Sequence, residues 1–140
     1  MGSEITVWWG PDDMVSALGF GTEENMAAVR AMKSSLASWH DATPVCLIDR
    51  KRLGALAAEQ GLAGYTPLER LVLATLGGVV ARSGVTPADK RVLIVLATTK
   101  GEIGSLGSAP ERCDLNRTAE VVGRHFGAAH RSLLISNACI

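Results

Sequence analysis

Hydrophobic positions along the chain follow two periods, which together predict alternating helices and strands. Helical spacing predicts helices over residues 23–36, 50–60 and 68–83, and from residue 116 or 118 to 126. Partial alternation predicts a first strand over residues 4–9, and apolar runs predict strands over residues 91–98 and 131–135. Residues 44–48 fit either a short strand or an extended loop. This order of elements predicts an α/β fold.

The helix over residues 68–83 carries the strongest local signals. Thr66 and Glu69 have the spacing of a capping box, and Pro67 occupies the first helical position between them. Gly84 is suited to end the helix. Because nearly every face of this helix is apolar or small, we expect it to be buried.

Length and composition fit a single α/β domain over residues 1–140. Hydrophobic residues make up 47% of the chain and aromatic residues only 4%, so the apolar content is mainly Ala, Val, Leu and Ile. This composition favours strands that are covered on both faces. Fourteen basic and fourteen acidic residues cancel, so the chain lacks the positive charge that nucleic acids or anionic membranes attract.

The chain has no apolar run of about 18 residues and no basic-then-apolar leader, so we expect neither a membrane span nor a signal peptide. Its cysteines, Cys46, Cys113 and Cys139, are odd in number and far apart. That spacing predicts no disulfide framework and no zinc site, and a reducing cytoplasm is the expected location. We therefore expect no metal and no cofactor.

A glycine-bearing loop follows the strand over residues 91–98 and invites comparison with phosphate-binding loops. Lys100 precedes Gly101, whereas a Walker loop needs the lysine after its last glycine. The next glycine, Gly104, is three residues on, which does not fit the dinucleotide-binding pattern. We interpret the segment as a loop that needs positive φ at the carboxyl end of a strand.

The histidines and two of the cysteines carry little chemical signal. His40, His125 and His130 are not spaced as metal ligands, although a Cys–His pair from distant parts of the sequence stays open. Cys46 and Cys113 are interpreted as a half-buried small residue and a loop thiol.

Cys139 differs because a strand-like run leads directly into it. Residues 133–135 are followed by the small polar turn Ser136, Asn137 and Ala138, and then by Cys139. A strand that turns sharply before a helix exposes the nucleophile in other folds. A helix N-terminus at that point lowers the pKa of a cysteine thiol and makes it nucleophilic. The alternative is a structural cysteine near a strand end.

Four stretches in this order resemble the N-terminal half of a β-ketoacyl-acyl carrier protein synthase, a condensing enzyme of the thiolase-like fold. They are residues 14–19 with Asn25, the helix over residues 68–83, residues 96–103, and Ser136-Asn137-Ala138-Cys139. The resemblance implies the N-terminal half of a thiolase-like fold, with a mixed, mostly parallel sheet covered by helices.

The resemblance also implies an activity and partners. Cys139 would accept an acyl group from a carrier-protein or CoA thioester, and its backbone N–H would contribute to an oxyanion hole. The carbanion from decarboxylation of a malonyl thioester would then attack the acyl group in a Claisen condensation. The family dimerises through the strand before the cysteine, here from Leu133 to Ser136, which implies a homodimer or a heterodimer with a ketosynthase-like subunit.

The catalytic histidines of this family follow the cysteine, and none of His40, His125 and His130 matches their positions. We therefore expect residues 1–140 to be part of a longer polypeptide and to be inactive in condensation alone. Two alternatives are a non-catalytic ketosynthase-like subunit, against which the presence of Cys139 argues, and a stand-alone α/β interaction domain.

Overall fold

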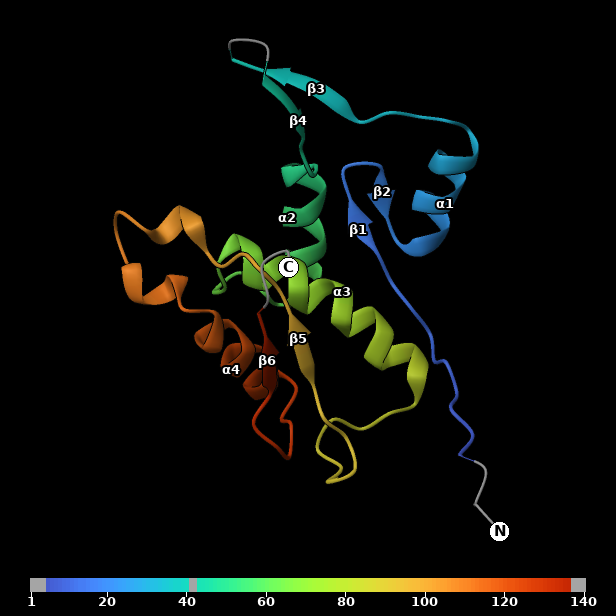
Figure 1. Cartoon of the computed structure of the whole chain (residues 1–140), viewed down its shortest axis with the longest axis vertical. Helices are drawn as coiled ribbons and strands as arrows, with labels where there is room; N and C mark the ends of the chain where they lie inside the picture. Colours follow the sequence, from blue (N-terminus) through green and yellow to red (C-terminus); the bar gives the residue numbers. More distant parts are fainter. Residues whose placement is uncertain (1–4, 41–42, 137–140) are drawn as a thin grey trace.

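The computed structural model describes residues 5–40 and 43–136 and shows a mixed α/β chain (Figure 1). Its helices are α1 (Thr22–Arg30), α2 (Arg50–Glu59), α3 (Pro67–Ser83) and α4 (Leu115–His125), with short 3₁₀ helices η1 (Ile103–Ser105) and η2 (Pro110–Cys113). Its strands are β1 (Val15–Ser16), β2 (Gly19–Phe20), β3 (Leu36–Trp39), β4 (Thr43–Cys46), β5 (Val95–Ala97) and β6 (Leu133–Ile135). The α/β class is thus confirmed.

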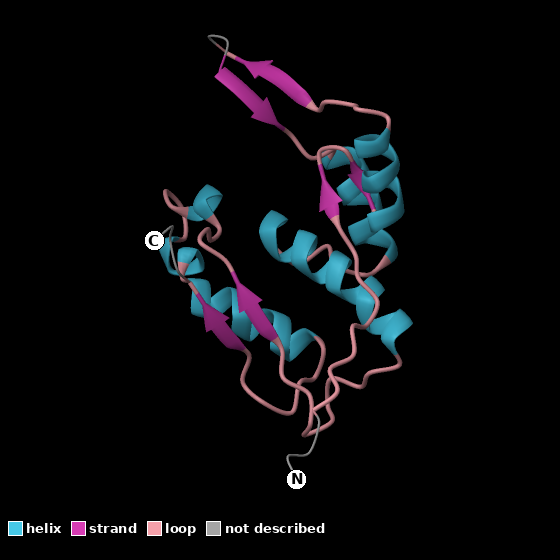
Figure 2. Ribbon diagram, turned by 45° about the vertical axis from the view of Figure 1, so that its right-hand side comes forward, coloured by secondary structure: helices cyan, strands magenta, loops and turns pink. Residues whose placement is uncertain are grey.

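The strands of the described residues form three separate two-stranded sheets. β1 pairs with β2 and β3 pairs with β4, both antiparallel, whereas β5 and β6 are parallel. β5 lies between α3 and β6, and α4 lies against the β5–β6 pair (Figures 1 and 2). Parallel pairing in the described chain is therefore confined to β5 and β6.

Helix α3 forms as its local sequence predicts. The Thr66 hydroxyl accepts a hydrogen bond from the Glu69 amide at 3.3 Å, and the Glu69 carboxylate accepts one from the Thr66 amide at 2.8 Å. Both halves of the capping box are present, so the first turn has its amides satisfied. Gly84 ends the helix in the left-handed region at φ 67°.

The core is small and lies where α2, α3 and α4 meet. Its buried members are Ala57, Leu62, Leu73, Ala74 and Val122. The expectation that α3 is buried all round is wrong, because its buried residues are only Glu69, Leu73 and Ala74. The remaining apolar side chains of α3 are partly exposed because, among the described helices and strands, α2 and α4 are the elements that pack closely on this helix.

Two predictions near the N-terminus are wrong. Residues 5–10 form no strand, because strands need a pairing partner and this segment extends away from the body in Figure 1. Helix α1 ends at Arg30 rather than at residue 36. Met32 adopts φ 49°, which turns the chain out of the helix, and Leu36 begins β3 instead.

The chain between α1 and α2 forms an antiparallel hairpin that projects from the body (Figures 1 and 2). The sequence of residues 44–48 fits either a short strand or an extended loop. The structure shows the strand β4 there. Its partner β3 was not predicted. The register joins Leu36 with Cys46 and Trp39 with Thr43.

The later elements follow the predictions with shifted bounds. β5 and β6 are each three residues long and lie within the strands predicted over residues 91–98 and 131–135. Helix α4 begins at Leu115, because the Asp114 carboxylate accepts from the Asn116 amide at 2.9 Å and caps the helix. α4 ends at His125, and Gly127 follows with φ 60°.

Candidate functional site

The carboxyl ends of β5 and β6 lie side by side at one edge of the parallel pair (Figure 2). The Leu133 amide donates to the Ile94 carbonyl at 2.9 Å, and the Thr98 amide donates to the Ile135 carbonyl at 3.0 Å. In open parallel sheets, ligands bind beyond the carboxyl ends of the strands. This edge is therefore the part of the fold best placed to hold a reacting group.

A cavity of about 490 Å³ opens at this edge. It is lined by Ala97, Thr98, Thr99 and Ile135, which are the last residues of β5 and β6 and the two that follow β5. Ser136 is the last described residue of the chain and comes directly after β6. The predicted nucleophile Cys139 lies outside the described residues, three positions beyond Ser136.

The loop after β5 begins with a turn that Thr98 organises. Its hydroxyl donates to the Lys100 carbonyl at 2.8 Å and accepts from the Lys100 amide at 3.1 Å. Threonine side chains often form such local hydrogen bonds to the backbone two residues on, and these bonds stabilise a turn. Thr98 therefore fixes the direction in which the chain leaves the cavity.

Glu102 anchors the same loop to the start of α3. Its side chain is buried, with 8% of the residue exposed, and its Oε2 accepts from the Leu68 amide at 3.0 Å. Leu68 lies in the first turn of α3, where backbone amides lack partners within the helix and the dipole favours negative charge. The carboxylates of Glu69 and Glu102 both serve this helix start, which supports the interpretation of residues 98–104 as structural rather than phosphate-binding.

Cys113 closes the far side of the loop. Its thiol, which is partly buried, donates to the Glu102 carbonyl at 3.1 Å. A Cβ built on Gly101 would lie 2.6 Å from the Cys113 carbonyl oxygen and 3.0 Å from a Leu115 methyl group. Gly101 is therefore required by close backbone approach rather than by a positive φ, which corrects the conformational reason given for this glycine.

The histidines that the structure describes do not line the cavity at the carboxyl edge. His125 Nδ1 lies 3.0 Å from the Tyr65 hydroxyl, and His130 Nε2 lies 2.7 Å from the Lys90 carbonyl oxygen. His40 follows β3 in the projecting hairpin, and Cys46 is exposed in β4. The described chain therefore brings none of these residues to the candidate site.

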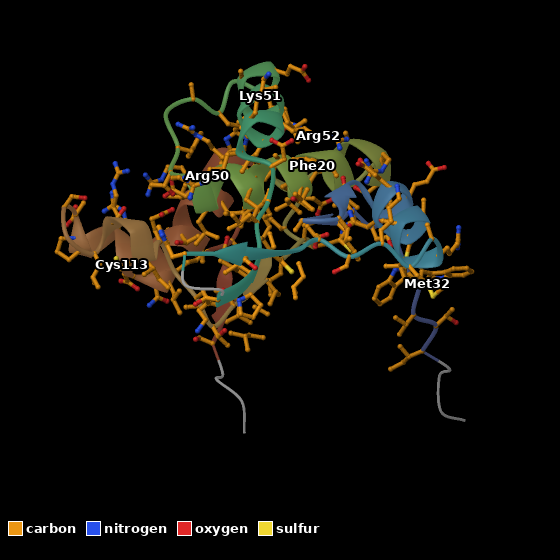
Figure 3. The ribbon with its side chains drawn as sticks, turned by 90° about the horizontal axis from the view of Figure 1, so that it is seen from above. Phe20, Met32, Arg50, Lys51, Arg52 and Cys113 are labelled. Atoms are coloured by element: carbon orange, nitrogen blue, oxygen red, sulfur yellow. The ribbon has the colours of Figure 1, made fainter. Side chains whose placement is uncertain are left out.

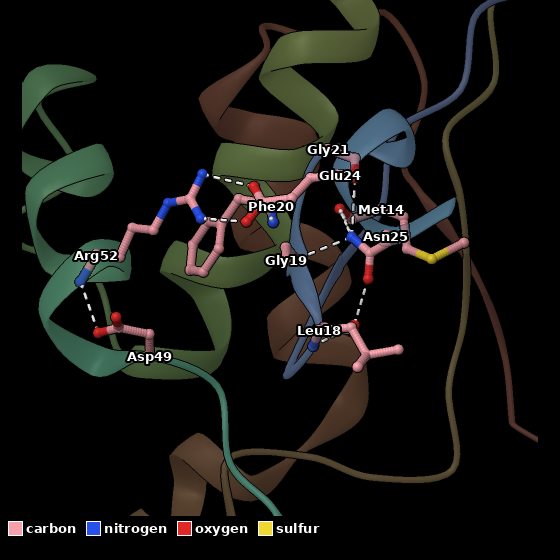
Figure 4. A network of polar contacts seen from close by, with 10 residues as sticks. Met14, Leu18, Gly19, Phe20, Gly21, Glu24, Asn25, Asp49 and Arg52 are labelled. Atoms are coloured by element: carbon pink, nitrogen blue, oxygen red, sulfur yellow. Dashed lines mark hydrogen bonds and ion pairs between the residues drawn. The ribbon is translucent and has the colours of Figure 1, made fainter. Parts of the chain in front are cut away.

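Asn25 is the centre of a network of hydrogen bonds (Figure 4). Sequence patterns alone gave this residue no role. It is 2% exposed, and its amide nitrogen donates to the carbonyls of Met14, Gly19 and Gly21 at 3.2, 2.9 and 2.8 Å. Its Oδ1 accepts from the Ser16 hydroxyl. Asn25 thereby holds the β1–β2 turn against α1.

A charged cluster joins the same turn to α2. Arg52 forms a bidentate ion pair with Glu24, with both N–O distances at 2.7 Å, and its guanidinium carbon lies 4.6 Å from the centre of the Phe20 ring. Figure 3 places Arg52 beside Phe20, on a different part of the molecule from Cys113. Hydrogen bonds from Arg52 and from the Phe20 amide lower the pKa of Glu24 from 4.5 to about 2.

Among residues 5–40 and 43–136, no cluster of three or more acidic, histidine or cysteine side chains is arranged to hold a metal ion. No described helix combines the length and apolar character that spanning a membrane requires. No protein-family model, curated protein or solved structure matches this chain.

Proposed function

We propose that residues 1–140 are the N-terminal part of a β-ketoacyl synthase with a thiolase-like fold, and that Cys139 is its acyl-accepting nucleophile. The observation that carries the proposal is the parallel pairing of β5 with β6. This pairing brings Ser136, the first residue of the Ser-Asn-Ala-Cys sequence, to the edge where the anchored loop after β5 begins. β5 overlaps residues 96–103, and β6 leads directly into Ser136-Asn137-Ala138-Cys139; these are two of the stretches that resemble the family.

In the proposed first half-reaction, the Cys139 thiolate attacks the carbonyl carbon of an acyl thioester of carrier protein or CoA. A tetrahedral oxyanion forms and collapses, the bond to the donor sulfur breaks, and the donor leaves as a thiolate. The acyl group is then held on Cys139 as a new thioester. The Cys139 N–H is the donor that we assign to the oxyanion.

In the second half-reaction, a malonyl thioester loses carbon dioxide, and the electrons of the broken carbon–carbon bond form a carbanion. This carbanion attacks the acyl carbonyl, the bond to the Cys139 sulfur breaks, and a 3-oxoacyl thioester leaves. His125 is hydrogen-bonded to Tyr65 and His130 to the Lys90 carbonyl, away from the candidate site. These contacts support assigning decarboxylation to groups other than these two histidines.

Pairing of β6 with a second subunit belongs to the same proposal. Leu133 and Ile135 are 48% and 50% exposed, and β6 pairs with β5 alone among the described strands. The strand from Leu133 to Ser136 therefore offers both an open edge and apolar side chains, which are features that favour pairing with another chain. A second copy or a ketosynthase-like subunit would fit it.

The alkylation rate of Cys139 tests the proposed nucleophile. In the natural polypeptide that carries these residues, Cys139 is expected to react with iodoacetamide faster than a free peptide thiol at pH 7, with a pKa below about 8.5. Cys46→Ser and Cys113→Ser are matched controls that leave this fast phase in place. Reaction at the rate of a peptide thiol, or a fast phase that survives Cys139→Ser, would contradict the proposal.

A further inference from the structure

A polar cavity of about 490 Å³ lies between the last turns of α4 and the start of β6. The residues that line it come from α4 and from the loop over residues 127–132, which joins α4 to β6 (Figure 1). Small-molecule sites commonly have a volume of about 300–1,000 Å³. Ser132 immediately precedes β6, so this cavity lies at the amino-terminal end of that strand, whereas the candidate site lies at its carboxyl end. The two cavities are therefore separate.

Ser132 lines this cavity with a buried hydroxyl group. The residue is 8% exposed, and its Oγ has no hydrogen-bond partner within the described chain. Buried hydroxyl groups normally have a partner, because the hydration that they lose is otherwise not replaced. Gly123 of α4 makes room for the hydroxyl, since a Cβ at this position would overlap the Ser132 Oγ. The packing of α4 on β6 therefore accommodates a polar group that no described residue satisfies.

The charges that line the cavity favour an anion. Glu120 is the one acidic residue in this lining, and its carboxylate is paired with Arg131 at 2.7 Å. Arg124 also lines the cavity and takes part in none of the ion pairs of the described chain. A guanidinium group has five N–H donors, so Arg131 can bind Glu120 and a ligand together. The cavity therefore offers an unpaired arginine, a shared arginine and a free hydroxyl.

Hydrogen bonds hold the loop between α4 and β6 in place. His130 Nε2 lies 2.7 Å from the Lys90 carbonyl oxygen and donates to it, because a carbonyl oxygen only accepts. The Ala129 amide donates to the Pro87 carbonyl at 3.2 Å, and the Ala128 amide donates to the Gly123 carbonyl at 2.9 Å. The wall of the cavity is therefore preformed, which lowers the entropic cost of binding a ligand there.

We propose that this cavity binds a phosphate group. The Ser132 hydroxyl donates to one phosphate oxygen, and the guanidinium groups of Arg124 and Arg131 pair with the others. A phosphate group carries a charge of about −1.5 to −2 at pH 7 and three strong acceptor oxygens, which match donors from three side chains better than the two oxygens of a carboxylate do. The volume left beside the phosphate holds the organic part of a phosphate ester. The inference does not depend on the role of Cys139.

Calorimetric titration tests this site in the natural polypeptide that carries these residues, with inorganic phosphate, glycerol 3-phosphate and acetate at constant ionic strength. Saturable phosphate binding is expected, and Arg124→Met and Ser132→Ala are each expected to weaken it about tenfold, as the loss of one hydrogen bond to a charged group implies. Arg117→Met is the matched control, because Arg117 is an exposed residue of α4 about two turns earlier and does not line the cavity. Tighter binding of glycerol 3-phosphate than of phosphate assigns the site to an ester, and equal binding assigns it to free phosphate; both results support the proposal.

The stability of Ser132→Ala distinguishes a ligand-binding hydroxyl from a structural one. Because the hydroxyl has no partner in the described chain, this variant is expected to keep or raise the urea midpoint when phosphate is absent. Phosphate is expected to raise the midpoint of the parent protein more than that of the variant. A lower midpoint of Ser132→Ala without phosphate would overturn the proposal. So would the absence of saturable phosphate binding, acetate binding as tight as phosphate binding, or equal weakening by Arg117→Met and Arg124→Met. None of these results bears on acyl transfer to Cys139.

Discussion

The Glu102 carboxylate accepts a hydrogen bond from the Leu68 amide at 3.0 Å, and the two residues are 34 positions apart. This contact ties the loop after β5 to the first turn of α3. The loop begins at the carboxyl ends of β5 and β6, where the candidate site lies. The contact therefore holds the loop in place beside that site. A buried, charge-assisted hydrogen bond of this kind contributes about 1.5–3 kcal/mol.

Substitutions at Glu102 test this anchor. Glu102→Ala leaves the Leu68 amide without its acceptor, and we expect a loss of about 2 kcal/mol in the free energy of unfolding. Glu102→Gln keeps an acceptor oxygen and loses the charge at the helix start, so about 1 kcal/mol is expected. The measurement is the urea midpoint, and the exposed Glu111→Gln is the control. If Glu102→Ala and Glu111→Gln lowered the urea midpoint equally, the hydrogen bond from Leu68 to Glu102 would not stabilise the fold as described.

Asn25 is expected to be among the most sensitive positions of the N-terminal part. Asn25→Ala leaves three carbonyl groups and the Ser16 hydroxyl without their partner, and about 2–4 kcal/mol of stability is expected to be lost. Asn116→Ala at an exposed position of α4 is the control, with an effect of about 0.5 kcal/mol. Thermal unfolding followed by circular dichroism measures both. A loss at Asn25 no larger than at Asn116 would contradict the network.

Gly101 is expected to tolerate no side chain. Gly101→Ala places a Cβ 2.6 Å from the Cys113 carbonyl oxygen, so the loop must shift, and a cost of about 1–3 kcal/mol is expected. Gly107→Ala in the same loop meets nothing within 4 Å and serves as the control. Denaturant midpoints of the two variants give the comparison. Similar midpoints would show that the loop does not approach η2 as described.

The Glu24–Arg52 pair predicts a pH dependence at the acidic end. The pKa of Glu24 is lowered from 4.5 to about 2, first by the hydrogen bonds from Arg52 and then by that from the Phe20 amide. Because the folded-state pKa is depressed, the stabilisation is present above about pH 4.5 and is lost as the pH falls toward 2. NMR titration of the Glu24 carboxyl carbon measures this pKa.

Two variants distinguish the effect of the Glu24–Arg52 ion pair on the pKa of Glu24 from the effect of nearby positive charge in general. Arg52→Met is expected to raise the pKa of Glu24 toward 4.5, whereas Lys51→Met, one position earlier, leaves it near 2 because Lys51 makes no contribution to the shift. An unchanged Glu24 titration in Arg52→Met would contradict the bidentate pair.

Local sequence signals were sufficient to predict where helix α3 begins and ends. Thr66 and Glu69 are three residues apart, so the capping box that starts α3 was visible in the sequence, and Gly84 marked its end. The bond between Asp114 and Asn116 that caps α4 is equally local, although the sequence patterns placed the start of that helix at residue 116 or 118 rather than at Leu115. These contacts form within one turn and do not depend on the rest of the fold.

Non-local contacts were beyond the sequence patterns. Residues 5–9 have the alternation of a strand, but a strand exists only with a partner, and periodicity does not reveal one. The bond from Leu68 to Glu102 joins distant segments, so Glu102 did not stand out as a site residue. Asn25 entered only through the family resemblance, and its carbonyl partners became apparent once the β1–β2 turn was placed.

The acyl adduct on Cys139 tests the central claim most directly. The natural polypeptide that carries these residues is incubated with an octanoyl thioester of carrier protein or CoA, and the modified cysteine is mapped by tandem mass spectrometry. The account predicts one octanoyl group on Cys139, retained in Cys46→Ser and Cys113→Ser and lost in Cys139→Ser. An adduct on Cys46 or Cys113, or no adduct while the donor thioester stays intact, would contradict it.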